Sequence, residues 1–400
     1  MSPLCLSLTL LLGASSASSA KPVPAAGALD KTALDALAAR AGELDTDALV
    51  VMHDGKIVLE RWFDGEPRRI ESMSVTKSVV AMAFGRLLMT GKLKSLDEPV
   101  STWYPEWRQG RKRGITVRHL LTQTSGLQAD PGTATEISGS RDFVQLALCA
   151  ELSTDPGRTF FYNNKATNLL AGLVQKISGQ RLDLFMKDEL FEPLGISDVV
   201  WLLDPSGNPQ GMSGLQLRPA DLAKLGQLML DEGKWKGQQL LSAEWVRDAT
   251  SEVPVSPSYG QLWWLIRDLT ITIDDDVIDQ WKKGGADPSF IAAVSKLKGR
   301  LMRADFFPAI NEALKEQGGE SAWAKNTWMK GLPDGKVVDS RTVGFRGDGW
   351  QGQHLIVLKA ERLVIVRMRQ PSQGNTPDEN KRYGFRELVK LARGLVSTGQ

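Results

Sequence analysis

The order of strand-like and helix-like segments constrains the fold of this chain more than any single motif does. Apolar runs at 48–53 and 56–63, joined by the turn Asp54-Gly55, predict a β-hairpin near the start. Helical periodicity then dominates, at 141–152, 164–179, 182–190 and 219–232. Strand patterns return only late, at 259–266, 342–345, 354–359 and 363–368. The sequence therefore predicts an α/β (α+β) fold in which an antiparallel sheet, flanked by helices, is split in sequence by a large helical block.

The domain organisation follows from the same pattern. A Pro/Ala/Gly-rich linker at 22–28 precedes a helical pattern at 29–44 that Asp30 opens as a cap. Residues 267–338, with helical stretches at 289–300 and 306–317, separate two strands that would otherwise follow closely, so we predict an insertion that covers or extends one end of the molecule. We assign a signal peptide to 1–20, a linker with an N-terminal helix to 21–44 and a single domain to 45–400. Within this domain, the helical block spans about 74–232 and the last helix 379–396.

Composition narrows the class of protein. Of all residues, 42% are hydrophobic and 24% charged, as in ordinary soluble globular proteins. The net charge of +2 gives no reason to expect nucleic acid as a partner. The apolar run at 4–14, followed by small residues at 17–20, predicts a cleavable signal peptide that is too short for a stable membrane anchor. We therefore expect a periplasmic or secreted protein, in which Cys149 remains as the only cysteine and no internal disulfide forms.

Ser74 and Lys77 form the first candidate chemical motif. They begin a helical run, 74–84, that is apolar nearly all round after Lys77 and therefore suits a buried helix. Side chains at i and i+3 share one helix face, so a lysine that loses its proton there could activate the serine as a nucleophile. The simpler interpretation is that Ser74 caps the helix and Lys77 is solvated. A second Ser-x-x-Lys match at Ser295 and Lys298 shows how unspecific the motif is alone.

Two further stretches carry candidate chemistry. Tyr162 and Asn164 stand just before a helix, where a phenol beside a lysine ammonium could be partly ionised and accept a proton. The alternative is an aromatic that only packs under a loop, with Asn164 capping the helix. The glycine-rich segment 347–353 leads into an apolar strand, where glycines would let a substrate lie close to the backbone. Its alternative is a simple turn.

Together these motifs resemble the serine β-lactamase and penicillin-recognising superfamily, nearest to class C β-lactamases and their esterase and nylon-oligomer-hydrolase relatives. The resemblance covers about 45–266 and 340–395 and includes 118–127, where a family histidine usually stands at the position of Gln123. It implies a β-lactamase-like fold. It also implies that Ser74 is the nucleophile and Lys77 its base partner. Tyr162 would then be the second proton carrier, and Asn164 would orient the substrate.

The same resemblance places Trp350-Gln351-Gly352 where the family has a Lys-Thr-Gly triplet. The backbone N–H groups of Ser74 and Gln353 would then form the oxyanion hole. Trp350 departs from the family, because antibiotic-processing members have a cation there that helps to hold the β-lactam carboxylate. An aromatic residue at this position is more similar to the esterases.

The resemblance implies an exported serine hydrolase that acts on ester or amide bonds of small-molecule or peptide substrates through an acyl-enzyme. A D-amino-acid peptidase or carboxypeptidase and a β-lactamase are the alternatives among enzymes. A non-catalytic ligand-binding relative is the alternative outside them, with the insertion closing the cleft or docking a partner. Three histidines, His53, His119 and His354, offer no context for a His-based triad, and no ligand cluster predicts a metal or other cofactor. The oligomeric state stays open.

Overall fold

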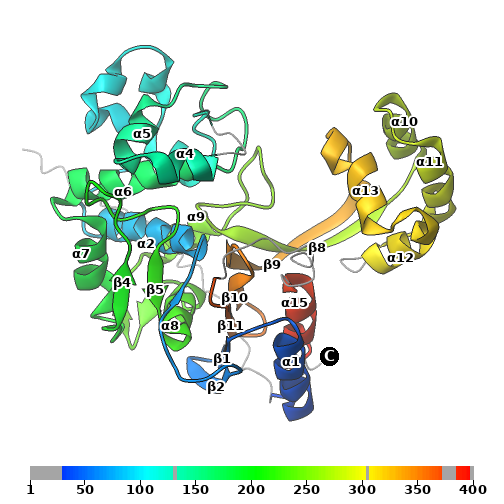
Figure 1. Cartoon of the computed structure of the whole chain (residues 1–400), viewed down its shortest axis with the longest axis horizontal. Coiled ribbons are helices and arrows are strands. Elements are labelled where there is room, and N and C mark those ends of the chain that lie inside the picture. Colours follow the sequence, from blue (N-terminus) through cyan, green and yellow to red (C-terminus); the bar gives the residue numbers. More distant parts are fainter. Residues whose placement is uncertain (1–28, 129–132, 303–305, 372–383, 397–400) are drawn as a thin grey trace, which may run out of the picture.

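The computed structural model describes residues 29–128, 133–302, 306–371 and 384–396. The signal peptide predicted at 1–20, the linker at 22–28 and the start of the helix predicted at 379–396 lie outside these ranges. The predicted fold class is confirmed, because helices pack on both faces of one antiparallel sheet (Figure 1).

The central sheet has six strands in the order β2-β1-β11-β10-β9-β8, and each neighbouring pair is antiparallel. The first hairpin joins the late strands through β1 and β11, where Ala48 lies opposite Met368. The sheet is therefore split in sequence as predicted. Its strands are β1 Ala48–His53, β2 Lys56–Trp62, β8 Trp264–Thr272, β9 Lys336–Gly349, β10 Gln353–Leu358 and β11 Leu363–Met368.

The helical block covers one face of the sheet and holds the larger apolar core. Its central helix, α2 Val75–Met89, is buried along nearly its whole length, which explains why its sequence is apolar all round. The other helices of this layer are α3 Val117–Leu121, α4 Thr133–Gly139, α5 Phe143–Cys149, α6 Asn164–Ser178, α7 Leu182–Met186, α8 Pro219–Leu230 and α9 Ala243–Ala249.

Short elements connect the helices of this block. A three-stranded sheet, in the order β3-β5-β4, and a two-stranded hairpin lie within it. The strands are β3 Ile70–Glu71, β4 Val199–Trp201, β5 Leu215–Leu217, β6 Lys234–Trp235 and β7 Gln238–Gln239. The single-turn helices are η1 Val100–Thr102, η2 Pro105–Arg108, η3 Arg111–Gly114 and the π-turn η4 Lys187–Phe191.

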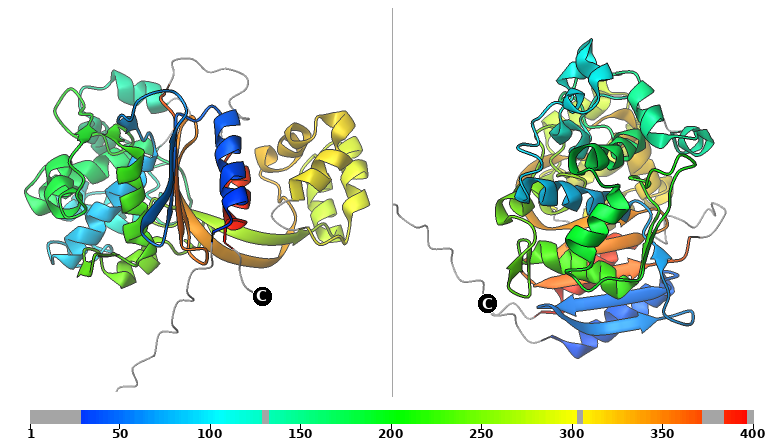
Figure 2. Two further views of the ribbon diagram at one scale, coloured as in Figure 1. Left: turned by 90° about the horizontal axis from the view of Figure 1, so that it is seen from below. Right: turned by 90° about the vertical axis from the view of Figure 1, so that its left-hand side faces the viewer.

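The opposite face of the sheet is covered by α1 Lys31–Glu43 and α15 Phe385–Arg393, which lie side by side (Figures 1 and 2). The predicted cap of α1 is confirmed, because the Asp30 carboxylate accepts hydrogen bonds from the N–H groups of Thr32 and Ala33. A second apolar core fills the space between these two helices and the sheet. The body of the molecule thus has three layers.

The insertion differs from the prediction at both of its ends. β8 and β9 continue as a two-stranded ribbon, so that Thr272 pairs with Lys336, and 267–272 and 336–338 belong to these strands instead of to the insertion. The strand predicted at 259–266 begins only at Trp264. Two α-helices of the insertion, at 275–283 and 320–326, were not predicted. The insertion contains α10 Asp275–Lys283, α11 Pro288–Val294, η5 Ser295–Leu297, α12 Phe306–Ala313, η6 Lys315–Gln317, α13 Glu320–Asn326 and η7 Trp328–Lys330.

The helices of the insertion share an apolar core of their own. Trp281 meets Phe290 and Trp323 at ring-centroid distances of 5.4 and 5.6 Å. The aspartates that open this segment have a structural role, because the Asp274 carboxylate caps α10. Figure 2 shows the insertion at the far end of the ribbon, beyond α1 and α15. It extends the molecule at that end.

Candidate active site

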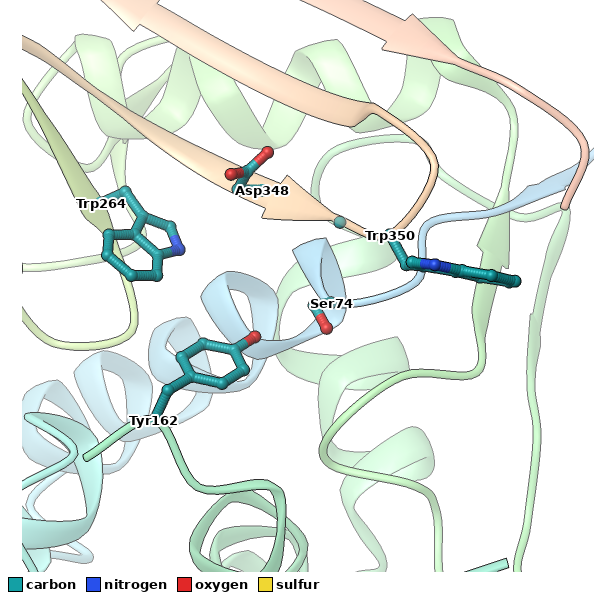
Figure 3. A pocket seen from close by; sticks show the side chains of 6 residues that line it. Ser74, Tyr162, Trp264, Asp348 and Trp350 are labelled. Carbon is teal, nitrogen blue, oxygen red and sulfur yellow. The ribbon is translucent and has the colours of Figure 1, made fainter. Parts of the chain in front are cut away.

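Ser74 stands at the start of α2 without acting as its cap. Its backbone is helical, with φ −71° and ψ −6°, and its side chain accepts no capping hydrogen bond. Met73 before it has a φ of +47°, in the left-handed region, which marks a sharp turn from β3 into the helix. The Ser74 hydroxyl is therefore presented to a cavity at the helix start (Figure 3).

Lys77 lies one turn further along α2 and is only 2% exposed. Its Nζ is 2.9 Å from the Ser74 Oγ and donates to the Met212 carbonyl at 2.7 Å. Burial without a carboxylate partner lowers the pKa of Lys77 to about 7. Comparable amounts of amine and ammonium are then present at neutral pH. The interpretation of Lys77 as a solvated first-turn residue is wrong.

Tyr162 reaches Ser74 from the segment before α6. Its hydroxyl points toward Ser74 (Figure 3), and its ring centroid lies 4.9 Å from the Lys77 Nζ. Burial raises the pKa of Tyr162 to about 12, the nearby Ser74 hydroxyl opposes this shift, and the charge of Asp348 adds to it. The phenol is therefore neutral at ordinary pH. Of the two alternatives for the proton acceptor, the lowered pKa of Lys77 therefore favours the lysine amine over an ionised Tyr162.

Gln123 holds the backbone N–H groups of both residues that flank Tyr162. Its carbonyl accepts the Phe161 N–H at 2.8 Å, and its side-chain Oε1 accepts the Asn163 N–H. Gln123 is 1% exposed and has a φ of +58°, which a non-glycine residue seldom adopts. The sequence marked this position only as a departure from the family histidine.

Asn164, which was predicted to bind the substrate, is the first residue of α6 and does not line the cavity. Asn163 is the cap, since its Oδ1 accepts the Ala166 N–H at 3.1 Å. The prediction that Asn164 caps this helix is therefore wrong by one residue. The Asn164 Oδ1 is buried and has no hydrogen-bond partner within the described chain.

The glycine-rich segment approaches Ser74 through residues that come earlier in the sequence than those predicted. The cavity is small, about 190 Å³, and is lined by Ser74, Tyr162, Trp264, Asp348, Gly349 and Trp350. A Cβ at Gly347 would come within 2.8 Å of Val75, and one at Gly349 within 2.7 Å of the Ser72 carbonyl. These two glycines therefore let β9 lie directly against the start of α2.

Three predicted residues of this segment do not reach the cavity. β9 ends at Gly349, so 350–352 form the turn to β10, and the chain leads away from Ser74. Gln351 is 2% exposed, the Gly352 carbonyl accepts from Arg367, and the Gln353 side chain bonds to the Arg369 backbone. Of the four predicted residues at 350–353, only Trp350 lines the cavity.

Asp348 is a charged residue at the cavity wall that the sequence did not single out. Its carboxylate meets the His354 Nδ1 at 2.8 Å and the Arg346 Nη2 at 3.0 Å. Burial favours the neutral acid, but the hydrogen bond from His354 and the nearby Arg346 charge outweigh it and lower the pKa of Asp348 to about 2. In Figure 3 the carboxylate points away from Ser74.

Aromatic rings stand on two sides of Ser74. Trp264 stacks on Tyr162 at a centroid distance of 6.0 Å, and Trp350, 39% exposed, lies on the other side of the serine (Figure 3). In the described ranges, His, Cys, Asp and Glu form no group of three or more that could hold a metal ion. No helix there combines the length and apolar composition that a membrane crossing requires.

Known proteins resemble this chain in sequence and in fold. The Beta-lactamase family model matches residues 34–389. Esterase EstB from Burkholderia gladioli is 33% identical over 157 residues, which are 34% of this chain and 40% of the esterase. The 6-aminohexanoate-dimer hydrolase from Paenarthrobacter ureafaciens is 27% identical over 282 residues, 60% of this chain and 71% of that enzyme. A solved penicillin-binding protein homologue from Caulobacter crescentus, 15% identical, has the same fold with a TM-score of 0.57 over 92% of this chain and 98% of its own.

Proposed function

The chain belongs to the β-lactamase family, and from this premise we propose that it is a serine hydrolase that cleaves ester or amide bonds through an acyl-enzyme on Ser74. One observation carries the proposal. Lys77 is buried with its Nζ 2.9 Å from the Ser74 Oγ, an arrangement that destabilises the ammonium and has no evident structural benefit. The esterase and dimer-hydrolase relatives support the reaction type.

The acylation step assigns one role to each of the three groups. The neutral Lys77 amine accepts the Ser74 proton while the Ser74 Oγ forms a bond to the substrate carbonyl carbon. The Tyr162 hydroxyl then gives its proton to the leaving group as the carbon–heteroatom bond breaks, and the Lys77 ammonium returns a proton to Tyr162. Deacylation repeats the sequence with water as the nucleophile. The neutral state of Tyr162 supports its use as a donor.

The oxyanion hole we propose differs from the one expected from the sequence. The Ser74 N–H belongs to the unpaired N–H groups at the start of α2, and the second donor is the Trp350 N–H, directly after the end of β9. Trp350 lines the cavity whereas Gln353 lies on β10, so Trp350 replaces Gln353 in this role.

The cavity favours uncharged substrates. Trp350 offers no cation for a carboxylate, and the Arg346 charge on β9 is already paired with Asp348. The rings of Trp350 and Trp264 on two sides of Ser74 suit an ester with a flat or apolar group. We therefore place neutral esters ahead of β-lactams and D-amino-acid peptides.

The insertion supports a catalytic rather than a purely ligand-binding protein. It is carried at the Lys336 end of β9, whereas the cavity lies at the Gly349 end of the same 14-residue strand. It therefore stands away from the cleft that a ligand-binding relative would close. The proposed site of action is the periplasm or the medium, on the leader-like composition of 1–20. Sequencing the N-terminus of protein recovered from a cell fractionation tests this location.

The reaction is tested with a panel of p-nitrophenyl esters, D-amino-acid peptides and a chromogenic cephalosporin. The informative pair of variants is Ser74→Ala and Ser295→Ala. Ser295 belongs to the second Ser-x-x-Lys match, but its hydroxyl donates to the Ile291 carbonyl and Lys298 pairs with Asp275. We expect ester hydrolysis that is lost in Ser74→Ala and kept in Ser295→Ala. Equal loss in both variants, or no turnover of any substrate by the folded protein, contradicts the proposal.

A further inference from the structure

The Met212 carbonyl is a second hydrogen-bond partner of Lys77, besides the Ser74 hydroxyl. It accepts from the Lys77 Nζ at 2.7 Å, so it helps to set the direction in which the amine approaches Ser74. Met212 lies in a loop, 211–214, that neither the motifs nor the proposed reaction accounts for. The residues that fix this loop therefore bear on the reaction.

Asn168 on α6 fixes the Met212 peptide. Its Oδ1 accepts two neighbouring N–H groups, that of Gly211 at 2.9 Å and that of Met212 at 3.1 Å. The Asn168 side chain is 1% exposed. Its Nδ2 is buried and has no hydrogen-bond partner within the described chain. The amide thus contacts the loop through its oxygen alone.

The loop has little freedom between its two neighbours. A Cβ at Gly211 would lie 2.0 Å from the Thr167 carbonyl oxygen, so only glycine allows the loop to rest directly on the α6 backbone. At the other end, the Gly214 N–H donates to the Glu71 Oε1 at 3.1 Å. Glu71 lies on β3, three residues before Ser74. The loop is therefore anchored to α6, which follows Tyr162 in the chain, and to β3, which precedes Ser74.

We propose that Asn168 is a positioning residue for the hydrolysis: by holding the Gly211 and Met212 N–H groups, it keeps the Met212 carbonyl against Lys77 and the Lys77 amine against Ser74. This inference rests on the proposed function, because it concerns the same reaction. Asn168 acts through Met212. A buried asparagine can also serve only to join two segments, so the test needs a measurement that a purely structural role would not change.

Asn168→Asp supplies that measurement. The carboxylate keeps the accepting oxygen, and it gives up no known hydrogen bond because Nδ2 has no partner in the described chain. It adds a negative charge beyond the Met212 peptide. The groups that face Lys77 are the Ser74 hydroxyl, the Tyr162 phenol and the Met212 carbonyl, and no neighbouring carboxylate contributes to its pKa. The new charge favours the ammonium, so the acid limb of the kcat/KM profile should move up by roughly one pH unit.

Asn168→Ala and Asn168→Ser test the positional effect. Alanine releases both N–H groups, and we expect kcat to fall roughly 10- to 100-fold with little change in KM. Serine retains a short acceptor and gives a milder loss, which keeps the test informative if the alanine variant does not fold. Gln227→Ala on α8 is the matched control, because the Gln227 Oε1 also accepts a backbone N–H, from Gly55, but lies outside the cavity lining. Its kcat and acid limb should match the wild type.

The inference is overturned if Asn168→Asp leaves the acid limb unmoved, or if Asn168→Ala and Asn168→Ser lower kcat no more than Gln227→Ala does. Both results require a wild-type protein that turns over esters, with the folding of each variant checked by its melting temperature. A wild-type protein without turnover and without a Ser74 adduct contradicts the proposed function itself. The two failures are therefore distinct.

Discussion

The Lys77 Nζ and the Ser74 Oγ are 2.9 Å apart on consecutive turns of one buried helix. A serine that only caps a helix would accept from the backbone of the first turn, and Ser74 does not. A lysine that only solubilises a helix start would be exposed, and Lys77 is 2% exposed. The pair therefore has the arrangement of a nucleophile and its base.

We expect kcat/KM for a p-nitrophenyl ester to rise with pH through a single acid limb near pH 7. Burial lowers the pKa of Lys77 to about 7, and only the neutral amine can accept a proton, so activity is lost below that pH. The pKa of Tyr162, raised to about 12, predicts no loss of its proton below pH 10. Lys77→Arg keeps a cation that cannot lose its proton, so kcat/KM should fall roughly 100- to 10,000-fold. An acid limb near pH 4 would point to a carboxylate base instead.

Lys77 and Tyr162 should act as one proton-handling unit. Both contact Ser74, so Lys77→Ala and Tyr162→Phe should each cost roughly 100- to 10,000-fold in kcat/KM, and the double variant little more than either. Tyr104→Phe is the matched control, because Tyr104 is also a buried phenol but does not line the cavity. Losses that multiply in the double variant would show that the two residues work separately.

Short neutral esters should be hydrolysed more efficiently than nitrocefin. A charged contact to the β-lactam carboxylate is worth roughly 1.5–3 kcal/mol, or about 10- to 150-fold in rate, and Trp350 does not supply one. Trp350→Lys should narrow the ratio of ester to nitrocefin kcat/KM, whereas Trp350→Ala should not. A wild-type preference for nitrocefin would show that the cavity recognises a carboxylate in another way.

Removal of the helical insertion should leave the hydrolase intact. The variant replaces 273–335 by a two-residue Asn-Gly turn between Thr272 and Lys336, which already face each other in the ribbon. The insertion has its own apolar core and stands at the strand end remote from the cavity. We expect a cooperative thermal transition and kcat/KM within a few-fold of wild type. A folded variant that has lost its ester activity would assign the insertion a part in the site.

Elements with strong periodicity were predictable from the sequence. The first hairpin, the buried α2 helix and β11 at Leu363–Met368 occur where their patterns place them, because the amphipathic or apolar period of each is set by local residues. The ribbon of the insertion was missed, although its first strand carries a signal. Leu269 and Ile271 alternate with polar residues and pack into the core of the insertion. The facing stretch of β9, 336–339, is exposed and has no such pattern.

The candidate site was predictable only in part. Ser74, Lys77 and Tyr162 come together in the structure, whereas their proposed roles await experiment. Gln123 and Asn168 were not identified as positioning residues, because each bonds to a segment about 40 residues away and no local pattern records that pairing. The glycine-rich segment was misplaced because its sequence does not reveal where β9 ends. The tight contacts of Gly347 and Gly349 with the start of α2 determine which part of the segment lies against Ser74.

The most direct test of the central claim is to locate the covalent adduct formed by an active-site fluorophosphonate, by mass spectrometry of the digested protein. The account predicts one adduct, on the peptide that carries Ser74, formed faster as pH rises through 7 and absent from Ser74→Ala and Lys77→Arg. Labelling should persist in Ser295→Ala. An adduct on another residue, or an unlabelled Ser74 in a protein that still hydrolyses esters, would contradict the account.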